Sequence, residues 1–469
     1  MDEFSEEQML SLVAQIQDWQ CFPTPLPRAK FQQALRIQEI YNLLYCSIAE
    51  DEQWIHDAIQ DIIPVEPLAA ALWSIYEAAK ETGYLQNISA GIFRSDYMLH
   101  LNNGIEPRVP GAIFETSLKQ VEMNTFSASG GSHANKVGNM HRYLARTGLY
   151  NVNDASVDFS SLPVNKNIES IVSCLALAHS TYGGPRSQEA KQTAVLMIVQ
   201  PHNNIHSGTE KIQCQPIDSN LAPMFLSTPG SQKTENYSST PVARIDNTIA
   251  YLRAGYEAKE YNHAGWEARL QLENSAAIKC PSLLAHIATF KKVQQALTAP
   301  GALERFLSES DAATIRETFV PVYPLDESEQ GLIARALAFD PIKSANYILK
   351  PSLEGGGNNV YGTKIPDYLA AIPQTQWCSY ILMERIQPPV QSNLLMGPAA
   401  LDSGETVSEL GILGCCLWQS QWDTTSARRC EMLHNTVGGW TFKTKFADVD
   451  EMSVVKGYGH FDTPRLMDV

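Results

Sequence analysis

The stretch Lys350-Pro351-Ser352-Leu353-Glu354-Gly355-Gly356-Gly357-Asn358-Asn359-Val360-Tyr361-Gly362 carries the strongest local signal in the chain. A strand-like segment ends in a lysine, and a carboxylate, three glycines and two amides follow. Consecutive glycines let the backbone approach a ligand and turn its N–H groups toward an anion. Lys350 supplies a point charge for phosphate, and Glu354 is suited to hold Mg²⁺. This order of residue types favours a phosphate-binding loop over a glycine-rich surface turn.

The sequence lacks the motifs of three common types of site. Residues 357–364 only approximate a Walker A loop, because Thr363 precedes Lys364. There is no G-x-G-x-x-G after a strand and no G-x-S-x-G turn. The sequence therefore favours neither a P-loop, nor a dinucleotide site, nor a nucleophile elbow.

The composition is that of an acidic globular protein. Its 469 residues, 44% of them hydrophobic, are ample for a core, and this length suggests about three domains. The net charge of −16 argues against nucleic acid or an anionic lipid surface as a partner. Anion binding therefore requires a local basic pocket.

Sequence patterns also bear on the compartment and on metals. No apolar stretch approaches the ~20 residues that cross a bilayer, and the first residues are acidic rather than signal-like. Nine cysteines without a C-x-x-C pair are typical of a reduced, cytoplasmic protein and do not fit zinc. His202 and His206 lie in a turn-like stretch, which does not favour a metal site.

A second chemical signal is Glu122-Met123-Asn124, within a strand-like segment over residues 119–125. Residues i and i+2 of a strand point to the same face, so Glu122 and Asn124 present two oxygen atoms together. Oxygen ligands suit Mg²⁺, and Glu354 would complete a set of three. The alternative is a plain exposed strand face.

Basic residues lie beside several strand-like or loop-like segments. Arginine suits bidentate binding of carboxylates, and lysine suits phosphate. Two of the lysines alternate on one strand and so face one side. Taken singly, each basic residue is better explained as a solvated surface charge. The residues are Arg94, Arg253, Lys291, Lys292, Lys443 and Lys445.

Hydrophobic periodicity indicates a mixed α/β or α+β chain. The first 85 residues are predicted to form helices over Glu6–Trp19, Ala29–Ile48 and Leu68–Ala79, which serve as scaffold. Residues 190–290 read as an α/β unit with strands Ala194–Val199 and Thr248–Arg253 and a helix Trp266–Ala277. The last third favours strands Tyr347–Lys350, Tyr380–Met383, Leu410–Leu417 and Trp440–Phe446.

In several separate motifs, in order over residues 90–460, the chain resembles the eukaryotic-type glutathione synthetases of the ATP-grasp superfamily. The motifs are Phe93–Met98, Lys119–Ser129, Arg253–Tyr256, Trp266–Leu270, Lys279–Pro281, Lys291–Gln295, Lys350–Gly362, Tyr380–Ile386 and Ser408–Ile412.

The resemblance implies an ATP-grasp body, an inserted α/β substrate-binding domain and a glycine-rich lid. The implied division is a helical part over 1–90, the first part of the body over 91–189, the substrate-binding domain over 190–300, and body with lid over 301–469. It also implies a homodimer that uses ATP and Mg²⁺ and acts on small molecules.

Positions that match the family's site residues fall into four groups. The implied catalytic residues are Arg94, Lys350 and Glu354, and the implied magnesium ligands are Glu122, Asn124 and Glu354. The implied ATP-binding residues are Glu122, Lys291, Lys350, Gly355, Gly356, Gly357, Asn359, Tyr361, Met383, Glu384, Arg385, Ile386, Glu409, Lys445 and Glu451. The implied substrate-binding residues are Arg94, Phe126, Ser127, Ala128, Ser129, His202, Asn203, Asn204, Arg253, Ala254, Gly255, Tyr256, Lys443, Val454 and Val455.

The family's reaction joins γ-glutamylcysteine to glycine while ATP is cleaved to ADP and phosphate. Phosphorylation turns the donor carboxylate into an acyl phosphate, which an amine can attack. The protein's part is mainly charge neutralisation, alignment and exclusion of water. Such a site needs Mg²⁺ ligands, lysines and a glycine loop, but no dedicated nucleophile.

This chain departs from the family pattern at the substrate positions. Gly208 stands where the family has a glutamine, Lys443 stands where it has an arginine, and 452–457 replaces a glycine- and alanine-rich run. Two hypotheses remain open: a glutathione synthetase with altered periphery, or a paralogous ATP-grasp ligase of specialised peptide metabolism with a changed donor, acceptor or both. A nucleotide-binding protein without ligase activity is disfavoured, because the presumed metal ligands and lysines are present.

Overall fold

The computed structural model describes residues 19–150, 157–186, 192–199, 224–225, 245–352, 357–396, 401–422, 428–454 and 457–468. Within these residues, eleven strands form one sheet in the order β13-β1-β16-β15-β14-β3-β8-β7-β5-β6, with β4 paired to β3. The strands are β1 (Trp19–Gln20), β3 (Ile88–Leu101), β4 (Thr116–Asn124), β5 (Gln192–Ile198), β6 (Met224–Phe225), β7 (Ile245–Leu252), β8 (Ile278–Cys280), β13 (Gln391–Met396), β14 (Leu401–Trp422), β15 (Arg428–Phe446) and β16 (His460–Phe461).

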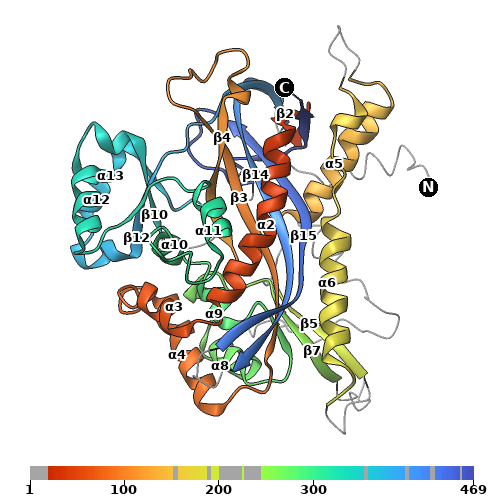
Figure 1. The fold of residues 1–469 in the computed structure, drawn as a ribbon, viewed down its shortest axis with the longest axis vertical. Coiled ribbons are helices and arrows are strands. Elements are labelled where there is room, and N and C mark those ends of the chain that lie inside the picture. Colours follow the sequence, from red (N-terminus) through yellow and green to blue (C-terminus); the bar gives the residue numbers. More distant parts are fainter. Residues whose placement is uncertain are drawn as a thin grey trace.

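The antiparallel hairpin β14–β15 runs along most of the large sheet, with β3 beside β14 (Figure 1). Side chains of β14 alternate between two cores. Ile412 and Cys416 pack in the core that holds α2 (Arg28–Ile48), whereas Leu413 and Cys415 pack in the core that holds α6 (Asn167–Tyr182). Because successive strand residues point to opposite faces, α2 and α6 cover opposite faces of the sheet.

Helix α2 approaches the sheet closely because β14 has a glycine at the contact. A Cβ atom at Gly414 would lie 1.9 Å from Oδ1 of the buried Asn42. Asn42 in turn donates to Oδ1 of Asn435 at 2.8 Å. The other helices are α3 (Glu52–Ile59), α4 (Pro67–Thr82), α5 (Gly131–Arg146), α8 (His263–Glu273), α9 (Leu283–Ile287), α10 (Lys291–Ala296), α11 (Glu309–Arg316), α12 (Glu329–Phe339) and α13 (Ile365–Ala371).

A smaller sheet stands to one side of the large one, together with α12 and α13 (Figure 1). It has the antiparallel order β11-β10-β12-β9 and its own core, which includes Leu325, Leu349 and Leu382. This sheet holds Lys350 at the end of one strand. The strands are β9 (Val322–Pro324), β10 (Tyr347–Pro351), β11 (Val360–Tyr361) and β12 (Tyr380–Glu384), while β2 (Thr24–Pro27) and β17 (Pro464–Met467) form a separate parallel pair.

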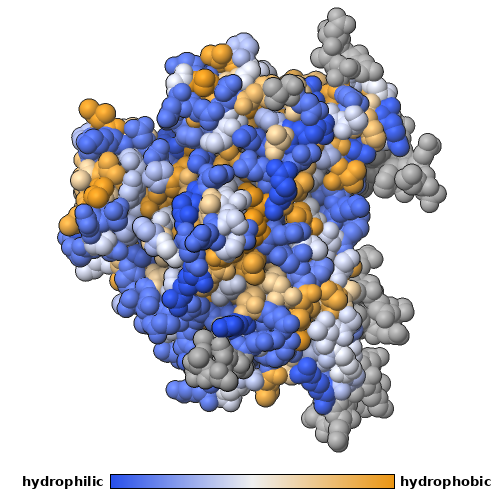
Figure 2. All heavy atoms as spheres, viewed as in Figure 1, coloured by the Kyte–Doolittle hydropathy of each residue, from blue (hydrophilic) through white to orange (hydrophobic). Residues whose placement is uncertain are grey.

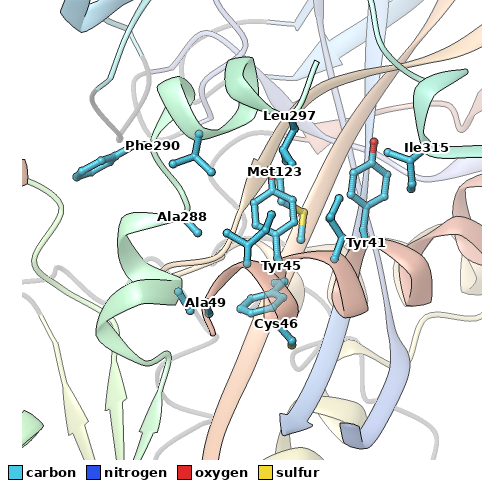
Figure 3. Close-up of a cluster of buried hydrophobic side chains, with 14 of the residues drawn as sticks. Tyr41, Tyr45, Cys46, Ala49, Met123, Ala288, Phe290, Leu297 and Ile315 are labelled. Atoms are coloured by element: carbon cyan, nitrogen blue, oxygen red, sulfur yellow. The ribbon is translucent and has the colours of Figure 1, made fainter. Parts of the chain in front are cut away.

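One part of the main core fixes elements that carry candidate site residues. Met123 of β4 lies near Tyr45 of α2, and Phe290, which precedes α10, belongs to the same core (Figure 3). Burial of these side chains therefore fixes β4 and the start of α10 in one core, in which α10 also contacts β4. The polar residues next to them in sequence take their places from this packing.

Most strands and helices predicted from the sequence are confirmed. The helix predicted over 29–48 is α2, and the helix predicted over 68–79 lies within α4. Each strand predicted from the sequence lies inside a strand of the structure or extends beyond its end by one residue. The helix predicted to reach Ala277 ends at Glu273, because the chain then turns into β8. Trp19 begins β1, and the rest of its predicted helix lies outside the described residues. Helices α3, α5, α6 and α9 to α13 were not predicted.

The described helices, the cysteines and one face of the surface each bear on an expectation from the sequence. In the part of the chain that the structure describes, no helix is long and apolar enough to cross a bilayer. All eight cysteines there are free thiols. The face drawn in Figure 2 is mainly hydrophilic, with apolar patches between the polar side chains.

A buried carboxylate after β16 predicts a pH dependence of stability. Burial raises the pKa of Asp462 to about 7, although Thr24, Thr444 and the N–H of Thr463 donate hydrogen bonds to it. In the unfolded chain the pKa is about 3.9. Between these values the folded state binds the proton and the unfolded state has lost it, so stability falls as the pH rises.

We therefore expect Asp462→Asn to gain stability relative to the parent protein as the pH rises from about 4 to about 7, by up to ~1.4 kcal/mol per pH unit. Urea unfolding at several pH values measures this difference. Asp448→Asn, at an exposed position, is the control and should give a flat difference. A flat difference for Asp462→Asn would contradict the expectation.

Candidate active site

A cavity of about 580 Å³ opens where the large and small sheets meet. This volume is within the range of small-molecule sites. Most of the residues singled out from the sequence line it. They are Arg94, Glu122, Asn124, Phe126, Ser127, Ala128, Ser129, Arg253, Tyr256, Lys291, Lys350, Asn359, Tyr361, Met383, Glu384, Arg385, Ile386, Glu409, Lys443, Lys445, Glu451 and Val454.

The pleat of β4 sends two polar side chains into the cavity. Met123 is 1% exposed and packs in the main core (Figure 3). Glu122 and Asn124 on either side of it therefore point the other way and line the cavity. Nδ2 of Asn124 donates to Oε1 of Glu122 at 3.3 Å and to Oδ2 of Asp96 at 3.1 Å. The prediction that Glu122 and Asn124 share a face is confirmed.

Two buried lysines flank Glu122. Nζ of Lys291 lies 3.2 Å from Oε2 of Glu122, and Nζ of Lys350 donates to the carbonyl of Val121 at 2.9 Å. Burial opposes charge on Glu122, but Lys291, Lys350 and Arg94 outweigh it and hold the pKa of this carboxyl well below its usual range. Burial lowers the pKa of Lys350. The result is an anion surrounded by cations at the cavity wall.

Arg94 of β3 forms a bidentate ion pair with Asp96. Nε and Nη2 of Arg94 donate to the two carboxylate oxygens, each at 2.7 Å, and Nη1 donates to the carbonyl of Ser129 at 2.8 Å. Burial opposes this charge, but Asp96 outweighs it and raises the pKa of Arg94. Asp96 was not predicted as a site residue, although it lies two residues from Arg94 on one strand and so shares its face.

Lys443 of β15 pairs across the hairpin with Glu409 of β14. The two residues are opposite each other in register, and Nζ of Lys443 contacts Oε1 of Glu409. Burial disfavours the charge on Lys443, but Glu409 outweighs it and raises the pKa of Lys443. Lys445 lines the same cavity, as predicted for alternating residues, and donates to the carbonyls of Val449 and Phe446.

Residues of the small sheet meet the loop after β15 at another wall of the cavity. The hydroxyl of Tyr361 donates to Oε2 of Glu451 at 2.9 Å, and Nδ2 of Asn359 lies 3.4 Å from the same oxygen. Arg385 lies 3.5 Å from Asp450 and stacks over the ring of Tyr361. Burial, followed by the charge of Glu451, raises the pKa of Tyr361.

The segment after β4 makes a tight hydrogen-bonded wall with the segment after β7. Nη1 of Arg253 donates to Oγ of Ser127 at 3.0 Å and to the carbonyl of Ala128 at 2.9 Å. The hydroxyl of Tyr256 donates to the carbonyl of Ser127 at 3.0 Å. The ring of Phe126 stacks on the buried His286 with 3.5 Å between centroids.

Several predicted residues do not line the cavity or lie outside the described residues. Ala254, Gly255 and Gly357 are described but are not part of its wall. The polar wall residues that sequence reasoning missed are Glu257, Glu260, Thr441, Asp450 and Ser453. The predicted residues outside the described ranges are Glu354, Gly355, Gly356, His202, Asn203, Asn204 and Val455, and Gly208 also lies there.

The side-chain oxygen atoms of Glu122 and Asn124 on β4 suit a hard divalent cation as ligands. The amide nitrogen of Asn124 is used by Asp96 and Glu122, so its Oδ1 is the atom left to act as a ligand beside the anionic Glu122. Mg²⁺ takes few protein carboxylates and fills other positions with water or phosphate oxygens. Among the described residues no cluster of three or more His, Cys, Asp or Glu side chains has metal-binding geometry.

Comparisons with known proteins agree over nearly the whole chain. The family described as "Eukaryotic glutathione synthase, ATP binding domain" matches residues 3–466. The chain is 30% identical to the glutathione synthetase large chain of Schizosaccharomyces pombe, over 95% of this chain and 90% of that protein. It is 31% identical to the glutathione synthetase of Dictyostelium discoideum (95% and 90%) and 30% identical to that of Homo sapiens (98% and 92%).

A solved structure shares the fold. A glutathione synthetase-like effector from Globodera pallida, in its apo form, superposes with a TM-score of 0.68 at 19% identity, over 96% of this chain and 90% of that one. At this identity the likeness concerns the fold alone. The expected ATP-grasp type of mixed α/β fold is confirmed.

Proposed function

Because the chain belongs to the eukaryotic glutathione synthase family, we propose that its cavity joins γ-glutamylcysteine to glycine while ATP is cleaved to ADP and phosphate. The observation that carries this proposal is the pair of buried lysines, Lys291 and Lys350, beside the half-buried Glu122 in the cavity wall. Cations that surround a carboxylate suit a metal–polyphosphate ligand, since phosphoryl transfer depends mainly on charge neutralisation and alignment.

In the proposed reaction, the donor carboxylate attacks the γ-phosphorus of ATP, and the bond to the bridging oxygen of ADP breaks. The amine of the acceptor then attacks the acyl carbon, phosphate leaves, and the ammonium proton is lost. Lys291 and Lys350 neutralise the phosphates, and Glu122 and Asn124 would hold Mg²⁺. When bound, Mg²⁺ supplies charge neutralisation to the transferring phosphoryl group.

The walls made by Arg94, Arg253 and residues 126–129 are proposed to hold the donor. Their backbone carbonyls and hydroxyls are already fixed by internal hydrogen bonds, which supports a preformed site. Asn359, Tyr361, the Met383–Ile386 segment and Lys445 are proposed to contact ATP. Mg²⁺, a homodimer, a cytoplasmic setting and the four-part division of the chain stated above belong to this same proposal.

A second candidate is a paralogous ligase with a changed acceptor. It is favoured by the contact between Lys443 and Glu409, because the ammonium of Lys443 is neutralised within the protein. A lysine also cannot bind a carboxylate through two parallel hydrogen bonds as arginine does. The acceptor end is therefore weakly equipped for the carboxylate of glycine.

Lys443→Arg tests whether Lys443 lies at the acceptor end of the cavity. If glycine is the acceptor, the fork of arginine should reach Glu409 and the glycine carboxylate together and lower the KM for glycine roughly threefold to tenfold. The KM for ATP should not change. Lys364→Arg, at an exposed position outside the cavity, is the control. An unchanged acceptor profile in Lys443→Arg would oppose this role.

A product assay separates the two candidates. The protein is incubated with ATP, Mg²⁺, γ-glutamylcysteine and an equimolar mixture of amino acids, and products are identified by mass spectrometry. Glutathione as the main product supports the first candidate, and another γ-glutamylcysteinyl adduct supports the second. Absence of any ATP-dependent adduct, with other dipeptide donors also tried, would overturn both.

A further inference from the structure

The short helical turn before α8 carries a carboxylate that binds the backbone of the preceding loop. Glu260 lies in the 3₁₀ turn Ala258–Glu260, and its side chain faces the cavity. Oε2 accepts the N–H of Gly255 at 3.1 Å, and Oε1 accepts the N–H groups of Tyr256 at 2.9 Å and of Glu257 at 3.1 Å. One side chain thus fixes three successive peptide groups of residues 255–257.

Helix capping explains only part of this arrangement. The bond from the N–H of Glu257 belongs to a capping box of the 3₁₀ turn. The N–H groups of Gly255 and Tyr256 precede that box, so their bonds to Glu260 are not part of it. Gly255 has φ +110°, and a Cβ atom there would lie 2.0 Å from the hydroxyl of Tyr261. The loop is therefore folded into one tight shape, which Glu260 holds from within.

Side chains of the segment after β7, which includes this loop, hold the segment after β4 in the cavity wall. Tyr256 donates to the carbonyl of Ser127, and Arg253 donates to the hydroxyl of Ser127 and to the carbonyl of Ala128. Ser127 has φ +49°, the one positive φ of a non-glycine residue in the described chain. A residue in this sparsely populated region needs surrounding contacts to keep it there. The anchor at Glu260 acts on Ser127 through Tyr256.

The same wall continues to the charged groups at the other end. The carbonyl of Ser129 accepts from Arg94, Arg94 pairs with Asp96, and Asp96 accepts from Asn124. The backbone of residues 127–129, together with these hydrogen bonds, thus links the loop of Glu260 to the oxygen pair on β4. A displacement of the loop would first alter residues 127–129, where the donor is proposed to bind.

We infer that Glu260 is a positioning residue that preforms the donor-binding wall by holding the peptide groups of residues 255–257. The name of the donor, γ-glutamylcysteine, rests on the proposed function above. The role of Glu260 in ordering the loop does not rest on it. Glu260 binds backbone groups of the protein, so its contribution to the reaction passes through Tyr256 and Ser127.

The experiment compares Glu260→Ala and Glu260→Gln with the parent protein. Glutamine keeps one oxygen acceptor, so it can retain the Oε1 bonds to Tyr256 and Glu257 but not the bond to Gly255. Glu267→Gln is the matched control, since Glu267 is an exposed glutamate of α8 outside the cavity. Amide hydrogen exchange of residues 254–258 reports loop order, and initial rates give the KM for γ-glutamylcysteine and for ATP.

We expect amide exchange over 254–258 to accelerate roughly tenfold or more in Glu260→Ala, and less in Glu260→Gln, with α6 unaffected. The KM for γ-glutamylcysteine should rise about tenfold in Glu260→Ala and be partly restored in Glu260→Gln, while kcat and the KM for ATP stay within about twofold. Glu267→Gln should match the parent in both measurements.

Two results would overturn the inference. One is unchanged exchange over 254–258 in Glu260→Ala. The other is faster exchange there without a selective rise in the KM for the donor, which would make Glu260 a local structural residue only. If the parent protein makes no product from γ-glutamylcysteine, the proposed donor is wrong. The exchange measurement then still decides whether Glu260 orders the loop.

Discussion

Replacing Glu122 by glutamine is expected to lower the rate of ligation about a thousandfold, which corresponds to about 4 kcal/mol of transition-state free energy. Glutamine keeps the shape of the side chain but removes the negative charge that lies between Lys291 and Lys350. The site then loses one of the anionic oxygen atoms that would hold Mg²⁺, and the lysines lose a counter-charge. Product formation at increasing Mg²⁺ concentration measures both consequences, since higher Mg²⁺ should restore only part of the rate.

Glu317→Gln, the same change at an exposed glutamate, is the control for this experiment. It should retain the parental rate and Mg²⁺ dependence. Thermal unfolding of Glu122→Gln verifies that the variant is folded when the rate is measured. A rate within tenfold of the parent protein, at the same Mg²⁺ concentration, would contradict the assignment of Glu122 to the phosphate and metal end of the cavity.

Replacing Arg94 by methionine is expected to cost about 3–5 kcal/mol of unfolding free energy and to abolish ligation. Asp96 is 1% exposed, and removal of its bidentate partner leaves a buried carboxylate with only the amide of Asn124. The carbonyl of Ser129 loses its donor as well. Urea unfolding measures the stability, and product formation measures the activity.

The double variant Arg94→Met/Asp96→Leu separates stability from function. Because apolar side chains replace both charges, most of the lost stability should return. Ligation should stay absent, since the wall beside Ser129 and Asn124 no longer has its charged groups. An Arg94→Met variant with the same urea midpoint as the parent protein would contradict the expected contribution of this buried pair.

Local periodicity was sufficient to predict part of the site. Glu122 and Asn124 are two residues apart on a strand, and the apolar Met123 between them is buried in the main core, so both polar side chains necessarily face the cavity. The same rule was available for Asp96, two residues from Arg94 on β3. The ion pair of Arg94 with Asp96 follows from that shared face.

Contacts between distant elements were not predictable from one sequence. The pairing of Glu409 with Lys443 depends on the register of β14 and β15, which includes two irregularities. The role of Glu260 depends on the path of the loop before it, because its partners are backbone N–H groups. No residue type or spacing in the sequence reports such partners.

In the fold, too, elements with a local pattern were predicted, whereas elements that depend on pairing with distant strands were predicted only in part. Helix α2 was predicted to within one residue at its start, since its apolar positions recur with helical spacing. Strand β14 was predicted only over Leu410–Leu417, although it extends over Leu401–Trp422. Gly404 and Gly411 interrupt the local strand pattern, but pairing with β13, β15 and β3 supplies the hydrogen bonds that keep the strand continuous.

The path of one oxygen atom tests the central claim most directly. γ-Glutamylcysteine labelled with ¹⁸O in its reacting carboxylate is incubated with the protein, ATP, Mg²⁺ and glycine, and the released phosphate is examined by mass spectrometry. If the carboxylate is activated as an acyl phosphate, each phosphate carries one ¹⁸O atom and ADP forms in equal amount with glutathione. Unlabelled phosphate, or AMP in place of ADP, would contradict this account.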